Sequence, residues 1–180
     1  MVDRLTDYDV TCGELIDTAF ASYQGMDPSP QWLVFAALVH RVTLGREDAS
    51  RNPLSVEGSG WVGCVGVTAH AERTGAASSR AQFATLEDGC RAAALLFQFR
   101  EHQAVQVAYR SGGPAELALS LEATAVPAGV DLRGFSAQVQ ALVERRQGSL
   151  WRRALSLYAP LGRRTVRPAR VAARPGARTI

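Results

Sequence analysis

The feature that most constrains the fold is a strongly apolar segment, Trp32 to His40, that leads through a polar stretch to Asn52-Pro53-Leu54. Over residues 30–44, apolar side chains fall on all sides of a helix, a pattern typical of a helix buried in the centre of a domain. Pro53 prevents this helix from continuing through Asn52. The sequence therefore predicts a central helix that delivers an acidic pair, Glu47-Asp48, to its polar end.

Other helices are expected where apolar residues recur at helical spacing. The expected ranges are 12–23, 86–109, 114–122, 132–146 and 149–158. Thr11 and Thr85 each precede an acidic residue by three positions, which marks them as helix caps. Residues 55–82 are glycine-rich and predict a long loop with one small hairpin. The expected fold class is all-α, with five or six helices in one domain over residues 1–158.

Charge is distributed unevenly along the chain, and all 20 basic residues are arginines. Residues 1–144 hold all 17 acidic residues and 10 arginines, a formal charge of −7, whereas residues 145–180 hold 10 arginines and no acid, a formal +10. Residues 159–180 have too few apolar side chains to fold alone, so we expect an arginine-rich extension there. Such asymmetry indicates contact with an anionic partner or with the acidic body.

The extension carries the candidate partner-binding residues, which are all arginines. They are Arg163, Arg164, Arg167, Arg170 and Arg174. A guanidinium group binds phosphates and carboxylates through paired hydrogen bonds. The expected partners are therefore protein subunits of a larger assembly or nucleic acid, and a solvated tail is the third interpretation.

Several classes of protein are disfavoured by the sequence. The longest apolar run is too short to span a bilayer, and the N-terminus lacks the apolar region of a signal peptide. We therefore expect synthesis in the cytoplasm and no membrane insertion. Cys12, Cys64 and Cys90 have neither zinc-site spacing nor a disulfide framework, so all three are expected to be reduced. No metal or cofactor is expected.

Three segments, in this order, resemble the lysozyme-like superfamily, in particular the muramidase and glucosaminidase-like domains of phage particles and bacterial cell-wall hydrolases. They are the apolar helix with its exit at Asn52-Pro53-Leu54, the stretch Gly63-Cys64-Val65-Gly66-Val67, and the stretch Phe83-Ala84-Thr85-Leu86-Glu87-Asp88-Gly89. In that family the helix carries a catalytic glutamate, the second stretch lines the cleft and the third starts a helix. The resemblance covers about residues 29–145 and implies a peptidoglycan-directed domain, associated with a virion or a cell-wall hydrolase.

The resemblance makes Glu47 the candidate general acid, because glycoside hydrolysis needs a protonated carboxyl group and commonly a second carboxylate. Glu57 is the candidate for that supporting role. Trp61 and Asn52 are candidate substrate-binding residues, since an exposed indole suits the apolar face of a sugar ring. Glu47 lies five residues before Asn52, closer than the family's glutamate. Either a short deletion has moved the acid, or the catalytic acid has been lost from a degenerate domain.

Each candidate also has a purely structural interpretation. Glu47 and Asp48 could be solvated residues at a helix end, and Trp61 could pack as part of a lid. His40, in the apolar helix, is expected to be a hydrogen-bonded core histidine, whereas His70 and His102 are expected at the surface. Two hypotheses follow: a peptidoglycan-directed domain that hydrolyses or merely binds glycan, or a non-enzymatic virion protein that docks through its arginine-rich tail.

Overall fold

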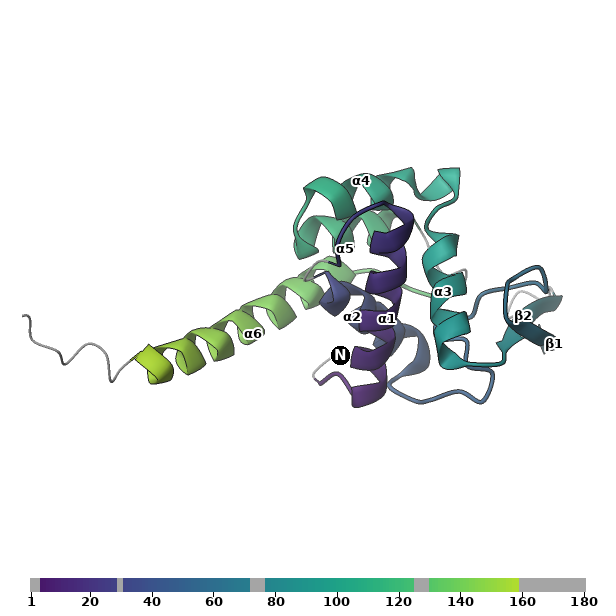
Figure 1. The fold of residues 1–180 in the computed structure, drawn as a ribbon, viewed down its shortest axis with the longest axis horizontal. Coiled ribbons are helices and arrows are strands. Elements are labelled where there is room, and N and C mark those ends of the chain that lie inside the picture. The colour runs from purple at the N-terminus through teal and green to yellow at the C-terminus, as the bar shows by residue number, and fades with distance from the viewer. Residues whose placement is uncertain (1–3, 29–30, 72–76, 125–129, 159–180) are drawn as a thin grey trace, which may run out of the picture. The chain divides into compact units, whose positions relative to one another are not determined.

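In the computed structural model, the chain is described over residues 4–28, 31–71, 77–124 and 130–158. Within these residues it is mainly helical, with six α-helices, a short 3-10 helix and one antiparallel hairpin (Figure 1). The elements are α1 (Asp7–Tyr23), α2 (Trp32–Thr43), β1 (Cys64–Ala71), β2 (Ala77–Phe83), α3 (Leu86–Leu96), η1 (Arg100–His102), α4 (Gln103–Ser111), α5 (Pro114–Ala123) and α6 (Phe135–Tyr158). The predicted helical fold class is confirmed, and the small hairpin expected within residues 55–82 is present.

Contacts divide the chain into two units, Met1–Glu144 and Arg145–Ile180. The boundary lies inside α6, before the predicted domain end at residue 158. It coincides with the change from acidic to arginine-rich composition in the sequence.

The core of the first unit lies where α1, α2 and α3 pack, and Figure 1 shows α1 and α3 side by side. Its centre is a cluster of buried rings from α1, α2, α4 and the end of α3: Phe20, Phe35, Tyr109 and Phe97. The rings of Phe20 and Tyr109 meet edge to face, with centroids 4.7 Å apart. The run from Leu33 to Val39 is fully buried, which confirms that α2 is the central helix.

The first helix begins earlier than the sequence predicted. Its cap is Thr6, whose hydroxyl oxygen accepts from Asp9 N (3.2 Å), while the Asp9 carboxylate accepts from Thr6 N (2.7 Å). Thr11, the expected cap, lies inside the helix, and its hydroxyl donates to Asp7 O. Thr6 and Asp9 form a complete capping box, which satisfies two backbone donors of the helix start at once.

The prediction of a single helix over residues 86–109 is wrong, because the helix is interrupted between α3 and α4. An unbroken helix would bring Glu101 onto the apolar stripe that contains Ala94 and Phe97. The break leaves Glu101 exposed, and Gln106 of α4 donates to the carbonyl of Phe97 (2.9 Å), which satisfies an acceptor at the end of α3. His102, expected at the surface, is instead buried against the Phe97 ring, with centroids 5.9 Å apart.

The two helices expected at 132–146 and 149–158 are one continuous helix, α6. The gap expected between residues 146 and 149 contains Gly148, but a glycine inside a helix costs only about 1 kcal/mol relative to alanine and does not end α6. The start of α6 is held by Glu122, whose carboxylate accepts from Gly134 N (2.7 Å), Ser136 N (3.0 Å) and the Ser136 hydroxyl (2.6 Å). These hydrogen bonds lower the pKa of Glu122, and the bonds from Ser136 have the largest effect.

The hairpin is joined to the segment that follows α2. Strands β1 and β2 pair antiparallel, with Val67 opposite Ala81 and an irregularity between Cys64 and Gly66. On the other side of β2, Ala81 N donates to Val56 O (2.9 Å), and Gly58 N donates to Ser79 O (2.8 Å). The segment from α2 therefore runs beside β2, which places the predicted site residues next to the hairpin.

Candidate functional site

The predicted site residues lie on residues 44–61, which connect α2 to the hairpin. Leu44 and Gly45 end α2 with positive φ angles of 56° and 73° and turn the chain away from the helix. The connection is then fixed to the end of the hairpin, because Phe83 N donates to Ser50 O (2.9 Å). A contact between segments distant in sequence therefore fixes the backbone in this part of the candidate site.

Glu47 and Asp48 are both exposed on this connection, beyond the end of α2. Asp48 accepts from Ser50 N (3.1 Å) and from the Ser50 hydroxyl, so its carboxylate stabilises the local turn. The general acid of a glycosidase needs partly apolar surroundings that keep its carboxyl group protonated. An exposed Glu47 does not have such surroundings.

Asn52, a candidate substrate-binding residue, has its side-chain amide bonded within the fold. Its side chain is 3% exposed. Its Nδ2 donates to Val56 O (2.8 Å) and Ala81 O (2.9 Å), and its Oδ1 accepts from Val56 N (2.8 Å). The amide therefore bridges the connection and β2, and its polar atoms face backbone groups rather than a ligand.

Trp61 is half-buried and is held by a hydrogen bond and a ring contact. Its Nε1 donates to the backbone carbonyl of Glu57 (2.7 Å), and its ring meets Phe99 edge to face at 6.1 Å between centroids. The Glu57 side chain is exposed, while its backbone pairs with Arg80 of β2. Next to Trp61, Val62 is 83% exposed. This arrangement leaves an aromatic pair beside an exposed apolar side chain.

Phe99 was not anticipated as a neighbour of Trp61. Sequence periodicity placed it inside an uninterrupted helix, and only the break after α3 leaves it half-exposed near Trp61. Its contact with Trp61 spans 38 positions of the chain, so no local pattern signals it.

The first turn of α3 lies directly against the connection. A Cβ atom on Gly89 would come within 1.9 Å of the Arg51 carbonyl oxygen, so only glycine permits this approach. The Arg51 guanidinium in turn donates to Ala84 O (2.8 Å). As predicted, Thr85 caps α3, with its hydroxyl oxygen accepting from Asp88 N (3.1 Å). The third motif of the sequence thus serves to pack α3 onto the segment that carries Glu47.

A buried carboxylate and a histidine pair at the ends of α1 and α2. His40 Nδ1 lies 2.7 Å from Asp9 Oδ2, and Asp9 is fully buried. His40 is hydrogen-bonded, as predicted, but it is only partly buried, with 16% of its side chain exposed. The sequence analysis did not single out Asp9, since the histidine that it meets lies 31 positions away on α2.

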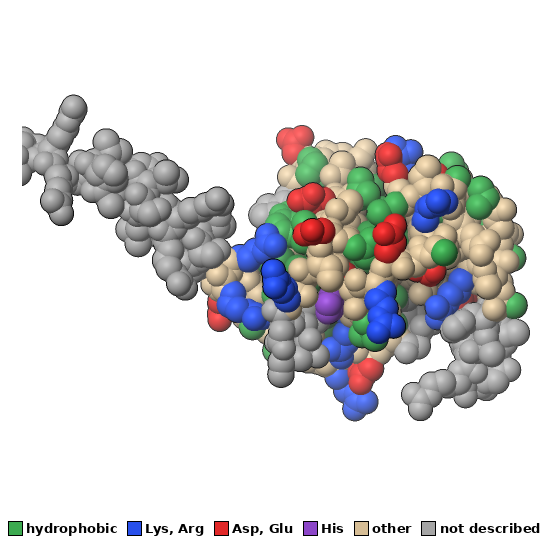
Figure 2. Space-filling view, turned by 90° about the horizontal axis from the view of Figure 1, so that it is seen from below, with side chains coloured by type: hydrophobic (Ala, Val, Ile, Leu, Met, Phe, Trp, Pro, Cys, Tyr) green, Lys and Arg blue, Asp and Glu red, His purple; other side chains and the backbone are tan. Residues whose placement is uncertain are grey.

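The candidate partner-binding arginines are not in the described part of the chain. Arg163, Arg164, Arg167, Arg170 and Arg174 all lie in residues 159–180. On the face of the molecule in Figure 2, acidic, basic and hydrophobic side chains are interspersed over the described residues. Among the described residues, that face shows no extended area of a single charge.

Hollows are present among the described helices. One of about 590 Å³ lies between α4 and α5, and one of about 350 Å³ lies between α1 and α3. Among the described residues there is no group of three or more His, Cys, Asp or Glu side chains arranged to hold a metal ion. No described helix has both the length and the apolar character needed to cross a bilayer.

Comparison with models of known families, with curated proteins and with solved structures finds no match. The lysozyme-like resemblance therefore stays a prediction from the three sequence motifs.

Proposed function

We propose that this chain is a non-catalytic, lysozyme-like domain that binds the glycan strands of peptidoglycan through Trp61, Phe99 and Val62, here named the aromatic patch. The observation that supports this proposal is the Trp61–Phe99 ring pair, next to the exposed side chain of Val62. Aromatic rings bind the apolar faces of sugar rings, and a polar neighbourhood supplies hydrogen bonds to their hydroxyl groups. Here the exposed carboxylate of Glu57 lies in the same loop.

The non-catalytic part of the proposal rests on the carboxylates. Glu47 and Glu57 are both exposed. Inverting and retaining glycosidases hold two carboxyl groups across one cleft, with one of them protonated. An exposed carboxylate on an irregular segment supplies neither feature.

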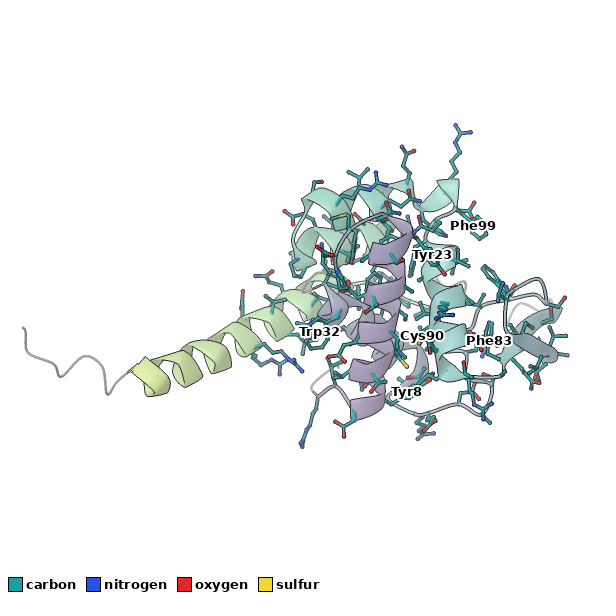
Figure 3. All side chains as sticks on the ribbon, viewed as in Figure 1. Tyr8, Tyr23, Trp32, Phe83, Cys90 and Phe99 are labelled. Atoms are coloured by element: carbon teal, nitrogen blue, oxygen red, sulfur yellow. The ribbon has the colours of Figure 1, made fainter. Side chains whose placement is uncertain are left out.

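Cosedimentation with purified, insoluble peptidoglycan tests the binding. Phe99→Ala and Val62→Ser should each lower the bound fraction, Phe99→Ala by about threefold to tenfold, because a ring contact contributes roughly 1 kcal/mol. Matched controls are Tyr23→Ala on α1, where the ring is 42% exposed, and Val107→Ser on α4, where the side chain is 56% exposed. Figure 3 labels Phe99, in the connection between α3 and η1, and Tyr23, at the end of α1. No sedimentation of the unaltered protein, or equal losses in patch and control variants, would refute glycan binding at the aromatic patch.

A lysis assay tests the absence of catalysis. The unaltered protein and Glu47→Gln should both leave the turbidity of a cell-wall suspension unchanged. Lysis by the unaltered protein that disappears in Glu47→Gln would overturn this part of the proposal and restore Glu47 as the general acid.

A second candidate function is assembly into a larger particle through the arginine-rich extension. It is favoured by the coincidence of the unit boundary, after Glu144, with the start of the basic sequence. Truncation after residue 158 should then abolish incorporation into the particle while the far-ultraviolet circular dichroism spectrum of the helical unit persists. If nucleic acid is the partner instead, the association constant should fall steeply as the salt concentration rises.

A further inference from the structure

A histidine is buried at the turn where the helix is interrupted between α3 and α4. His102, the last residue of η1, is 6% exposed, and its ring meets Phe97 edge to face with centroids 5.9 Å apart. The Phe97 ring in turn contacts Phe20 and Phe35 in the core, at 6.0 Å and 5.8 Å between centroids. The imidazole of His102 therefore packs onto the aromatic core at this turn.

The surroundings of the His102 ring suit a neutral imidazole. Nδ1 is buried and has no hydrogen-bond partner among the described residues. Nε2 lies 3.9 Å from Glu101 Oε1, on a side chain that is 72% exposed. A protonated imidazole carries an N–H at both ring nitrogens, so protonation would bury a donor at Nδ1 without an acceptor. The packed position therefore disfavours the charged ring.

The same turn positions Phe99 of the aromatic patch. His102 N donates to Phe99 O (2.9 Å). Gln106 Nε2 donates to the carbonyls of Phe97 (2.9 Å) and Phe99 (3.4 Å). The Phe99 ring meets Trp61 at 6.1 Å between centroids. Movement of His102 out of the turn would break the first of these bonds and release Phe99 from its contact with Trp61.

We propose that His102 is a pH-sensitive switch, whose protonation expels its ring from the contact with Phe97, opens the turn between α3 and α4 and separates Phe99 from Trp61. The inference rests on the proposed function, because Phe99 and Trp61 belong to the aromatic patch, and it makes glycan binding weaker in acid. The opening of the turn is measurable without glycan.

The pH range follows from the environment of the ring. Burial lowers the pKa of His102 below its ordinary value of 6.5, and the negative charge of Glu101 opposes that shift. A ring released into water takes up its proton near the ordinary value. The closed turn is therefore fully favoured above pH 6.5, and this preference is lost as the pH falls below that value.

Glu101 is the charged neighbour that acts on the His102 ring among the described residues. Tyr109 of α4 and Asp17 of α1 are hydrogen-bonded to each other (2.8 Å). The other titratable side chains of η1, α3 and α4 are Arg100, Glu87, Asp88, Cys90, Arg91 and Arg110. Those of α3 lie in its first two turns, whereas His102 packs against Phe97 beyond the last turn.

Nuclear magnetic resonance of the full chain, with isotope-labelled histidine and tryptophan, tests the switch between about pH 8 and about pH 4.5. His102 should titrate below pH 6.5, and the Trp61 indole resonance should shift with the same midpoint. Glu101→Gln should move both midpoints to lower pH, because it removes the charge that opposes the effect of burial. Glu87→Gln is the matched control, a 57% exposed glutamate on α3, and should leave both midpoints unchanged.

His102→Phe places a ring that cannot titrate against Phe97, so the Trp61 resonance should stay constant over the same pH range. If this variant does not fold, Glu101→Gln still decides the question, because that substitution is at an exposed position. A Trp61 resonance that stays constant while His102 titrates in the unaltered protein would overturn the proposal. So would a His102 pKa at or above 6.5, or equal midpoints in the two glutamine variants.

Cosedimentation with peptidoglycan at about pH 7.5 and about pH 5 separates this inference from the proposed function. The unaltered protein should lose bound fraction at the lower pH, whereas His102→Phe should keep it. Equal losses in both proteins would refute regulation by His102. Absence of binding at both pH values would refute the proposed function, and the resonances of His102 and Trp61 would still decide whether the switch exists.

Discussion

Replacing Asn52 by alanine tests whether this residue supports the fold or binds a ligand. The substitution removes three hydrogen bonds, two to the carbonyls of Val56 and Ala81 and one from Val56 N. At about 1 kcal/mol for each bond, the free energy of unfolding should fall by about 3 kcal/mol. The midpoint of thermal unfolding should then fall by about 6–12 °C for a chain of this size.

Urea unfolding followed by circular dichroism and tryptophan fluorescence measures this change. Gln82→Ala is the matched control, because its amide lies on the same hairpin but donates to Thr68 (2.6 Å) at an exposed position. That control should change the free energy of unfolding by no more than about 0.5 kcal/mol. The structural assignment of Asn52 is refuted if Asn52→Ala unfolds like the unaltered protein but loses its sedimentation with peptidoglycan.

Two further predictions concern contacts made by the first unit. Gly89→Ala should lower the free energy of unfolding by about 2–3 kcal/mol, because its Cβ would overlap the Arg51 carbonyl oxygen. Gly60→Ala, where a Cβ meets no neighbour within 4 Å, should be nearly neutral in the same urea titration, and equal effects would contradict the close approach. The pKa of Glu122 is lowered below its ordinary value of 4.5 by its bonds to Ser136, so its stabilisation is present above that pH and is lost as the pH falls through the folded-state pKa. Glu122→Gln should therefore flatten the fall in thermal midpoint between about pH 5 and pH 3, and an unchanged acid dependence would show that this carboxylate does not anchor α6.

The helical elements were predictable because their signals are local. The dense apolar run of α2 predicts burial on every side, and Leu33 to Val39 are indeed buried. The Thr85 cap was also predictable, since a hydroxyl group and an acid three residues on form a self-contained motif. Glycine-rich sequence predicted irregular backbone with a hairpin over residues 55–82, where the structure has β1 and β2.

The candidate site was harder to predict than the fold, because its contacts join distant segments. The amide of Asn52 is occupied by backbone groups of Val56 and Ala81, one of which belongs to a strand 29 positions away. Phe99 reaches Trp61 only because the helix breaks after α3. Periodicity favours one straight helix there, and the burial of Phe97 and His102 outweighs that local preference.

The sequence by itself determined the helical class, the central position of α2 and the contrast between an acidic body and an arginine-rich end, because composition and periodicity carry these properties. Tertiary structure alone decided that Thr6 rather than Thr11 caps α1, since Thr6 holds the carboxylate of Asp9 that also meets His40. It also left Glu47 exposed beyond the end of α2. Each of these outcomes depends on which helices pack together, and packing is a property of the whole chain rather than of any one segment.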